Sequence, residues 1–170
     1  MKGFFWNSHG LRDLAKHRFL FDCSREHNLD FIAILETGKH NYSTECLDNF
    51  CAGAEYFWHW NPPRGMSGGI LLGFNLSNFV VDKIESGDSF LKFNLTNKSD
   101  GFRWALMAVY GAAQDEHKGA FLSELVRVCS DEVLPLVMGG DFNIIVIHLK
   151  RVTIGSIVDG LTYLIQLLKF

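Results

Sequence analysis

Apolar residues recur along the chain with two different periods, which predict alternating strands and helices. Apolar runs of the length typical of buried strands occupy residues 3–7, 29–36, 70–74, 104–111 and 133–143. Residues 90–95 alternate between apolar and polar positions, which is typical of a half-buried strand. Helical spacing predicts helices over residues 11–27, 43–51, 115–130 and 154–168. This alternation predicts one α/β domain over residues 1–170.

Two of the predicted helices carry a defined apolar face. In the first, the apolar positions at helical spacing are Leu11, Leu14, Ala15, Phe19 and Cys23. In the third, they are Phe121, Leu122, Leu125, Val126 and Cys129.

Polar side chains stand at the carboxyl ends of four predicted strands. They are Asn7, Glu36, Tyr110 and the pair Asp141 and Asn143. Two residues at positions i and i+2 of a strand lie on the same face, so the carboxylate and the amide of the pair would be neighbours. Ligands of α/β sheets gather at such strand ends. A single polar residue there is more often a cap or a turn residue, but its recurrence favours a site.

The residue types indicate what such a site would bind. Magnesium takes oxygen ligands from one or two carboxylates, while water and phosphate fill its other positions. Glu36 and Asp141 could be these carboxylates. Asn7 and Asn143 could bind or orient phosphate and water.

Composition and charge narrow the class of protein. The 170 residues are 48% hydrophobic and 21% charged, which is typical of a globular domain. The formal net charge is −3 and no Lys/Arg run is present, so any contact with nucleic acid has to be local. The four cysteines form no CxxC pair, which indicates free thiols in a reducing compartment.

The sequence also shows neither a signal peptide nor a membrane-spanning segment. The first residues turn polar at Asn7, which is unlike a signal peptide, and no apolar run reaches the length of a membrane span. We therefore expect no secretion and no membrane partner, and an intracellular location in the nucleus or cytoplasm.

Five segments in the same order and spacing resemble the endonuclease/exonuclease/phosphatase superfamily: "FFWNSHGL", "IAILETGK", "PPRGMSGGILLGF", "MAVYGAAQDEHKGAFLSEL" and "LVMGGDFNII". They look most similar to the endonuclease domain of plant LINE-type (non-LTR) retrotransposon polyproteins. The resemblance implies a two-sheet, four-layer α/β sandwich, Mg²⁺ or Mn²⁺ as cofactor and DNA as substrate. The implied activity is hydrolysis of a phosphodiester by in-line attack of water.

The same resemblance assigns roles to the five polar residues. Glu36 matches the glutamate that binds the metal, and Asn7 matches the asparagine that helps to hold the metal-bound phosphate. Tyr110 matches a position beside the scissile phosphate. Asp141 matches the acid that orients or activates water, and Asn143 the amide that contacts the phosphate in the transition state.

The chain also departs from the family pattern. Relatives close their site with a C-terminal Asp-His pair, whereas here only His148 and Asp159 follow Asn143, in contexts that do not match. The resemblance therefore implies a domain without its last strands. His9 stands where many relatives carry arginine. We expect the glycine pair at 68–69 to form a close backbone turn with a structural role only.

Two alternatives to a DNA endonuclease remain open. The first is a catalytically inactive remnant or binding module with the same fold. The second is a phosphatase that acts on inositol phosphates or lipid headgroups.

Overall fold

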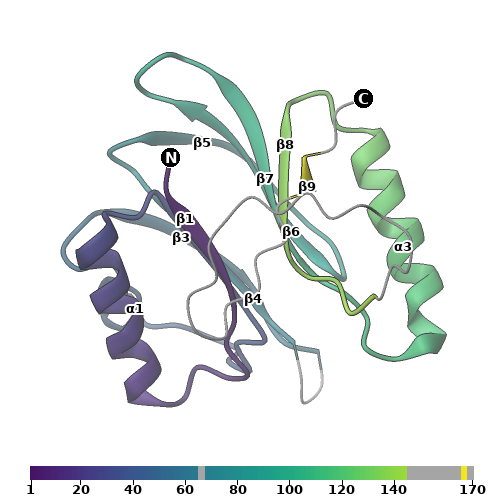
Figure 1. The fold of residues 1–170 in the computed structure, drawn as a ribbon, viewed down its shortest axis with the longest axis horizontal. Helices are drawn as coiled ribbons and strands as arrows, with labels where there is room; N and C mark the ends of the chain where they lie inside the picture. Colours follow the sequence, from purple (N-terminus) through teal and green to yellow (C-terminus); the bar gives the residue numbers. More distant parts are fainter. Residues whose placement is uncertain (65–67, 145–165, 168–170) are drawn as a thin grey trace.

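The fold is a sandwich of two mixed sheets (Figure 1), seen in a computed structural model that describes residues 1–64, 68–144 and the backbone of 166–167. The first sheet has the order β1-β2-β4-β3, with strands β1 (Gly3–Asn7), β2 (Phe31–Leu35), β4 (Ile70–Asn75) and β3 (Tyr56–Asn61). The second has the order β5-β6-β7-β8-β9, with β5 (Phe79–Ser86), β6 (Phe90–Asn97), β7 (Arg103–Tyr110), β8 (Leu136–Asp141) and β9 (Gln166–Leu167).

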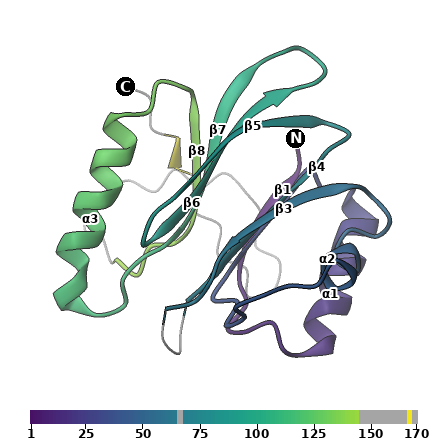
Figure 2. The same ribbon diagram turned by 180° about the vertical axis from the view of Figure 1, so that it is seen from behind.

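Helices cover the outer face of each sheet and complete four layers. Helices α1 (Leu14–His27) and α2 (Thr44–Asp48) lie on the first sheet, and α3 (Asp115–Ser130) lies on the second (Figure 2). The predicted two-sheet, four-layer α/β sandwich is therefore confirmed. Among the described residues, no helix is long and apolar enough to cross a membrane.

Three apolar clusters fill the spaces between the four layers. The cluster between the sheets is rich in phenylalanine, with Phe74 in tilted contacts with Phe31 and Phe93. A second cluster joins the first sheet to α1 and α2, and a third joins the second sheet to α3. Aromatic pairs of this kind add about 0.5–1.5 kcal/mol each beyond their buried area, so the sheets are held in a defined relative position.

The helices begin where capping residues satisfy their first amides. The carboxylate of Asp13 accepts a hydrogen bond from the amide of Ala15 at 2.9 Å, so α1 begins at Leu14 instead of the predicted residue 11. The hydroxyl of Ser43 caps α2 in the same way, and this short helix confirms the prediction over residues 43–51.

The predicted apolar faces of the two long helices are partly wrong. In α1, Leu14 is 77% exposed and Phe19 is 39% exposed, while Leu20 and Ser24 are buried. The inner face of α1 includes His17, whose ring packs edge-on against Phe50. The buried face of α1 thus contains polar side chains that have partners nearby, where the pattern predicted apolar ones.

In α3, Phe121 and Val128 are buried, whereas Leu122 and Val126 are 45% and 63% exposed. The helix is rotated so that Val128, which the pattern did not single out, faces the sheet.

The sequence pattern did not identify three of the described strands, β3, β5 and β9, and all three are at sheet edges. Strand β3 is a run of aromatic and polar residues that are all half-buried, so it lacks the alternation of a one-sided strand. Strand β5 contains an irregularity between Val81 and Lys83, which shifts its alternation midway. All of the strands that the pattern predicted are present. The predicted strand over 133–143 begins only at Leu136, as β8, because the interior of a central strand does not accommodate Pro135.

Most of the predicted C-terminal helix over residues 154–168 lies outside the described residues. At 166–167 the chain is in strand β9, which pairs with β8, so the helix does not extend over these two residues. All four cysteines are free thiols, as expected.

Two parallel strand pairs bring polar strand ends to one edge of the sandwich. Strand β1 runs parallel to β2, with Asn7 opposite Leu35, and β7 runs parallel to β8, with Tyr110 opposite Asp141. Since the carboxyl ends of parallel strands meet at one edge, each sheet presents two polar ends on the same side.

The glycine pair forms the predicted close turn at this edge. Gly69 has φ +90°, and a Cβ there would lie 2.5 Å from the hydroxyl of Thr37. The carbonyls of Gly68 and Gly69 accept hydrogen bonds from the amides of Gly38 and Thr37. This turn fixes the segment that follows Glu36.

Candidate active site

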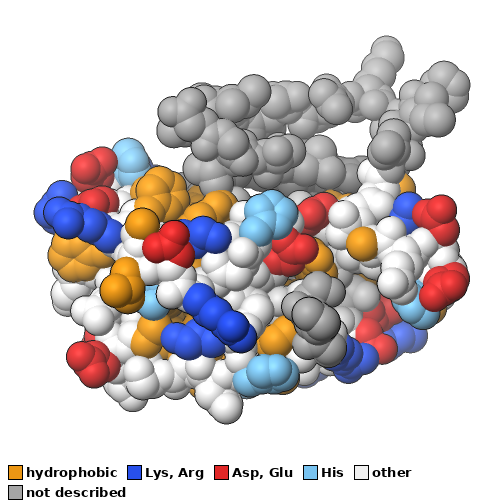
Figure 3. All heavy atoms as spheres, turned by 90° about the horizontal axis from the view of Figure 1, so that it is seen from below, with side chains coloured by type: hydrophobic (Ala, Val, Ile, Leu, Met, Phe, Trp, Pro, Cys, Tyr) orange, Lys and Arg blue, Asp and Glu red, His pale blue; other side chains and the backbone are white. Residues whose placement is uncertain are grey.

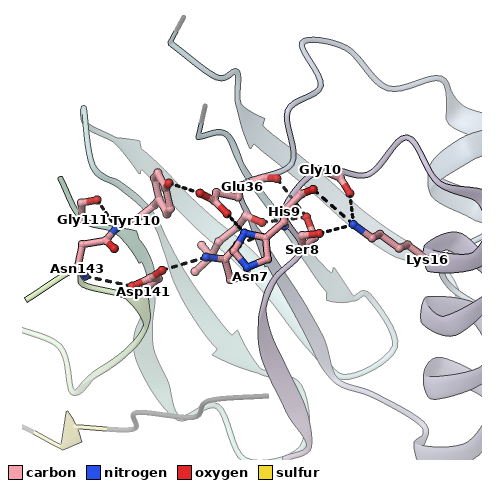
Figure 4. Close-up of polar contacts among 11 residues, drawn as sticks. Asn7, Ser8, His9, Gly10, Lys16, Glu36, Tyr110, Gly111, Asp141 and Asn143 are labelled. Carbon is pink, nitrogen blue, oxygen red and sulfur yellow. Dashed lines mark hydrogen bonds and ion pairs between the residues drawn. The ribbon is translucent and has the colours of Figure 1, made fainter. Parts of the chain in front are cut away.

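Four of the five predicted site residues form two hydrogen bonds that cross from one sheet to the other (Figure 4). The amide nitrogen of Asn7, at the end of β1, donates to Oδ2 of Asp141, at the end of β8, at 2.9 Å. The hydroxyl of Tyr110, at the end of β7, donates to Oε1 of Glu36 at 2.5 Å. Residues up to 134 positions apart thus form one half-buried polar cluster.

The backbone of Glu36 is held in an unusual conformation. Its φ is +52°, in the left-handed region that costs a residue with a side chain about 1–3 kcal/mol. Its carbonyl accepts hydrogen bonds from the amide of Gly10 at 2.6 Å and the hydroxyl of Ser8 at 3.2 Å. These contacts from the neighbouring loop offset the strain and direct the side chain toward the second sheet.

The two carboxylate oxygens of Glu36 differ in their surroundings. Tyr110 donates to Oε1, while Oε2 is buried and has no hydrogen bond of suitable geometry among the described residues. Nδ1 of His9 nevertheless lies against Oε2, although the geometry is not that of a well-aligned hydrogen bond. Oε2 is therefore the oxygen that a cation could reach.

Asp141 and Asn143 form a turn that closes the second sheet. The amide of Asn143 donates to Oδ1 of Asp141 at 3.1 Å, so both oxygens of this carboxylate have partners. Asn143 has φ +49°, a conformation that asparagine tolerates better than most residues. Its side-chain nitrogen donates to the carbonyl of Gly111 at 2.9 Å, which ties β8 to the segment after β7.

A lysine that sequence reasoning did not single out holds the first loop in place. Lys16, on α1, donates from Nζ to the carbonyls of Ser8 at 2.6 Å and Gly10 at 2.9 Å, with a longer contact to that of His9. The loop that carries His9 is thereby fixed to the helix. In the sequence, nothing separates Lys16 from a solvated lysine, because its partners are backbone atoms.

The environment of Tyr110 keeps its hydroxyl protonated. Burial, and after it the hydrogen bond to the negative Glu36, raise the pKa of Tyr110 well above its usual range. The phenol therefore acts as a hydrogen-bond donor at neutral pH.

The site residues fit a divalent cation that keeps part of its own water. Among the described residues, no three His, Cys, Asp or Glu side chains form a cluster that could hold a metal, which argues against a closed zinc site there. The buried Oε2 of Glu36, which has no hydrogen bond among the described residues, is instead the kind of carboxylate oxygen that a magnesium-type site uses. His148 and Asp159 lie outside the described residues.

A pocket with basic walls adjoins the cluster. Its volume is about 530 Å³, and its lining residues include His9, Arg12, Lys16, His40 and a single acid, Asp13. Figure 3 shows this end of the sandwich, where acidic and histidine side chains lie near the middle and side chains of both charges lie toward the edges. The basic lining of the pocket suits an anionic ligand that reaches the acids through a cation.

Comparison by sequence finds no matching family model and no matching curated protein. Comparison by structure finds many proteins with the same fold. The human Nocturnin catalytic domain with bound sulfate matches 84% of this chain at 14% identity, with a TM-score of 0.62. An endonuclease/exonuclease/phosphatase family protein from Bacteroides thetaiotaomicron matches 86% at 12% identity, with a TM-score of 0.60.

A third solved structure contains nucleic acid. It is the 3′ phosphatase NExo from Neisseria bound to a product DNA hairpin, which matches 85% of this chain at 18% identity, with a TM-score of 0.61. The chain spans 63% of the Nocturnin domain, 64% of the Bacteroides protein and 58% of NExo. At these identities the likeness establishes the fold, which is that of the endonuclease/exonuclease/phosphatase proteins.

Proposed function

We propose that the protein hydrolyses phosphodiesters in nucleic acid with the help of a divalent cation, Mg²⁺ or Mn²⁺, and that DNA is its substrate. One observation carries the proposal. Two carboxylates, Glu36 and Asp141, each accept a hydrogen bond from a neutral side chain of the opposite sheet, and no Lys or Arg side chain within the described ranges pairs with either. Such a concentration of negative charge is suited to a cation and not to structural stability.

The roles of the side chains follow from their contacts. When bound, the cation would offset charge on a phosphoryl oxygen. Glu36 would hold it through Oε2, with Tyr110 fixing the other oxygen. Asn7 orients Asp141 through its amide, and Asp141 would position the attacking water or accept its proton. Asn143 would turn its amide from Gly111 toward the phosphate.

The charge around the site supports a polyanionic substrate. The chain is negative as a whole, at −3, yet the pocket beside the cluster has four basic or histidine side chains and one acid. A local positive surface beside a metal site would guide a phosphate backbone to the carboxylates. The structural neighbours lend support too, since NExo was solved with a DNA hairpin. The similarity to LINE-type endonucleases belongs to the same proposal.

The experiment is nicking of supercoiled plasmid by the purified chain with Mg²⁺, with Mn²⁺ and with chelator. We expect metal-dependent nicking that falls by about 10²–10⁴-fold in Asp141→Ala. The matched control is Glu116→Gln, which removes an exposed acid on α3 and should nick at the rate of the unmodified chain.

Further arms of this experiment separate the alternatives. Cleavage of p-nitrophenyl phosphate without plasmid nicking would favour a phosphatase. A folded sample that binds DNA, measured by fluorescence anisotropy, but cleaves nothing would favour the inactive remnant or binding module and would overturn the proposal.

A further inference from the structure

His9 lies beside the Glu36 carboxylate and takes no part in the steps proposed above. It projects from the loop between β1 and α1, with Nδ1 against Oε2 of Glu36 (Figure 4). The histidine side chain is 78% exposed, while that of Glu36 is 22% exposed. An imidazole nitrogen therefore faces the carboxylate oxygen from the solvent side.

The choice of oxygen is fixed by the rest of the site. Oε1 of Glu36 already accepts from Tyr110, so a cation on this carboxylate would use Oε2. The side chain nearest to Oε2 from the first loop is that of His9. Any cation held there is within reach of Nδ1.

The backbone fixes these two side chains relative to each other. His9 and Glu36 both have left-handed φ angles, +46° and +52°. The amide of Ser8 donates to the carbonyl of Leu35 at 2.9 Å, and the amide of Gly10 donates to that of Glu36 at 2.6 Å. The two segments therefore flank His9 with hydrogen bonds, so the close approach of its ring does not depend on a flexible loop.

We propose that Nδ1 of His9 and Oε2 of Glu36 are both ligands of one divalent metal ion, and that the imidazole makes the site prefer Mn²⁺ over Mg²⁺. The proposal deepens the proposed function and rests on it. Imidazole suits transition metals, whereas Mg²⁺ favours carboxylate, carbonyl and water oxygens. A site with a nitrogen ligand thus gains affinity for Mn²⁺ that it does not gain for Mg²⁺.

The exposure of His9 provides the room that an ion requires. Two ligands of one ion lie roughly 3 Å apart, since each is about 2.0–2.2 Å from the metal. Because Tyr110 holds Glu36 in place, the ring of His9 has to move slightly outward, toward solvent, to make room for the ion. The solvent side of the ion then remains open to water and phosphate.

The test measures the binding of Mn²⁺ to the full chain by EPR at constant pH. Competition with Mg²⁺ in the same experiment gives the affinity for Mg²⁺. The main variant is His9→Asn, because asparagine tolerates the left-handed backbone and offers oxygen in place of nitrogen. We expect Mn²⁺ affinity to fall by about 10-fold or more while Mg²⁺ affinity stays within about 3-fold. Pulsed EPR should detect nitrogen coupled to Mn²⁺ in the unmodified chain but not in His9→Asn.

Two further variants make every result decisive. His40→Asn changes an exposed histidine of the neighbouring pocket and should leave both affinities unchanged. Glu36→Gln should weaken the binding of both Mn²⁺ and Mg²⁺. Unchanged or tighter Mn²⁺ binding in His9→Asn overturns the proposal, because His9 would then be a bystander or a competitor for Oε2. Nicking with no effect of His9→Asn on Mn²⁺ affinity refutes this inference alone, whereas nitrogen-coupled Mn²⁺ binding without nicking refutes the proposed function alone.

Discussion

The protein contains two clusters that each hold two carboxylates, and they are neutralised differently. On the outer face of the second sheet, beneath α3, Lys92 contacts Glu132 at 2.6 Å and Glu85 at 3.1 Å. The side chains of Lys92 and Glu132 are both 5% exposed. At the edge of the sandwich, Glu36 and Asp141 accept hydrogen bonds from neutral Tyr110 and Asn7, Glu36 also lies against His9, and neither carboxylate pairs with a described lysine or arginine.

The difference distinguishes carboxylates that the chain itself neutralises from carboxylates that it does not pair with a lysine or arginine in the described residues. A buried carboxylate next to an ammonium group is satisfied by the chain itself, so the first cluster needs nothing from solution. The second has a buried oxygen on Glu36 without a well-aligned hydrogen bond, approached by the imidazole of His9. This difference is the reason that the proposed chemistry is assigned to the second cluster and not to the first.

The largest expected effect comes from removing the internal cation. Lys92→Met leaves the buried carboxylate of Glu132 without its cation, while the more exposed Glu85 keeps its contact with Lys83, and we expect the free energy of unfolding to fall by about 3–5 kcal/mol. Urea unfolding followed by circular dichroism measures this change. Lys83→Met, at a 63% exposed lysine that contacts the same Glu85, is the control and should change stability by less than about 0.5 kcal/mol.

The rate of nicking should not follow this loss of stability. Per folded molecule, Lys92→Met should nick plasmid at the unmodified rate. A large loss of activity in a still-folded variant would contradict the separation of the two clusters.

A smaller effect is expected from Tyr110→Phe, which removes one hydrogen bond from Glu36 without changing charge. Oε1 then loses its donor and Glu36 is no longer oriented, so nicking should fall by about 10-fold and stability by about 1 kcal/mol. Tyr56→Phe is the matched control, because its hydroxyl donates to the carbonyl of Leu29 instead of a site residue. It should reduce stability without affecting nicking per folded molecule.

The smallest effect concerns pH. The hydrogen bond from Lys83, and after it those from Lys92, outweigh burial and lower the pKa of Glu85 from 4.5. Its contribution to stability is therefore present above pH 4.5 and is lost as pH falls through the lower folded value. Burial opposes the charge of Lys92, but hydrogen bonds to Glu132 and Glu85 outweigh it and raise its pKa, so its contribution persists up to about pH 10.5 and is lost above that.

Unfolding free energies measured from about pH 3 to pH 7 test the acid side. The Glu85→Gln variant should lack the corresponding part of the decline. An identical acid decline in both proteins would contradict the assignment.

The sequence predicted which polar residues lie together better than it predicted the secondary structure at the sheet edges. Polar residues at strand ends were sufficient to predict that Asn7, Glu36, Tyr110 and Asp141 lie together, because parallel strands bring their carboxyl ends to one edge. Their functional roles stay a prediction. Strands β3 and β5 escaped because an edge strand need not alternate as a one-sided strand does, and an aromatic run or a bulge obscures the period further.

The contact between His9 and Glu36 could not be predicted in the same way. It depends on left-handed backbone at both residues and on hydrogen bonds between loops that lie 27 positions apart. Neither left-handed conformation occurs at a glycine, so no glycine in the sequence indicated that the backbone would turn at these two residues. Likewise, Lys16 binds backbone carbonyls, whose positions exist only in the folded chain.

The two hydrogen bonds between the sheets also bear on the order of events during synthesis. Asn7 and Glu36 are made early, but their partners Tyr110 and Asp141 come from the second sheet, and Asp141 is the last of the four. A nascent chain that has completed only its first sheet holds half of the cluster and no paired carboxylates. The cluster is therefore assembled only when the sheets dock, and a probe of its polar contacts would report that docking.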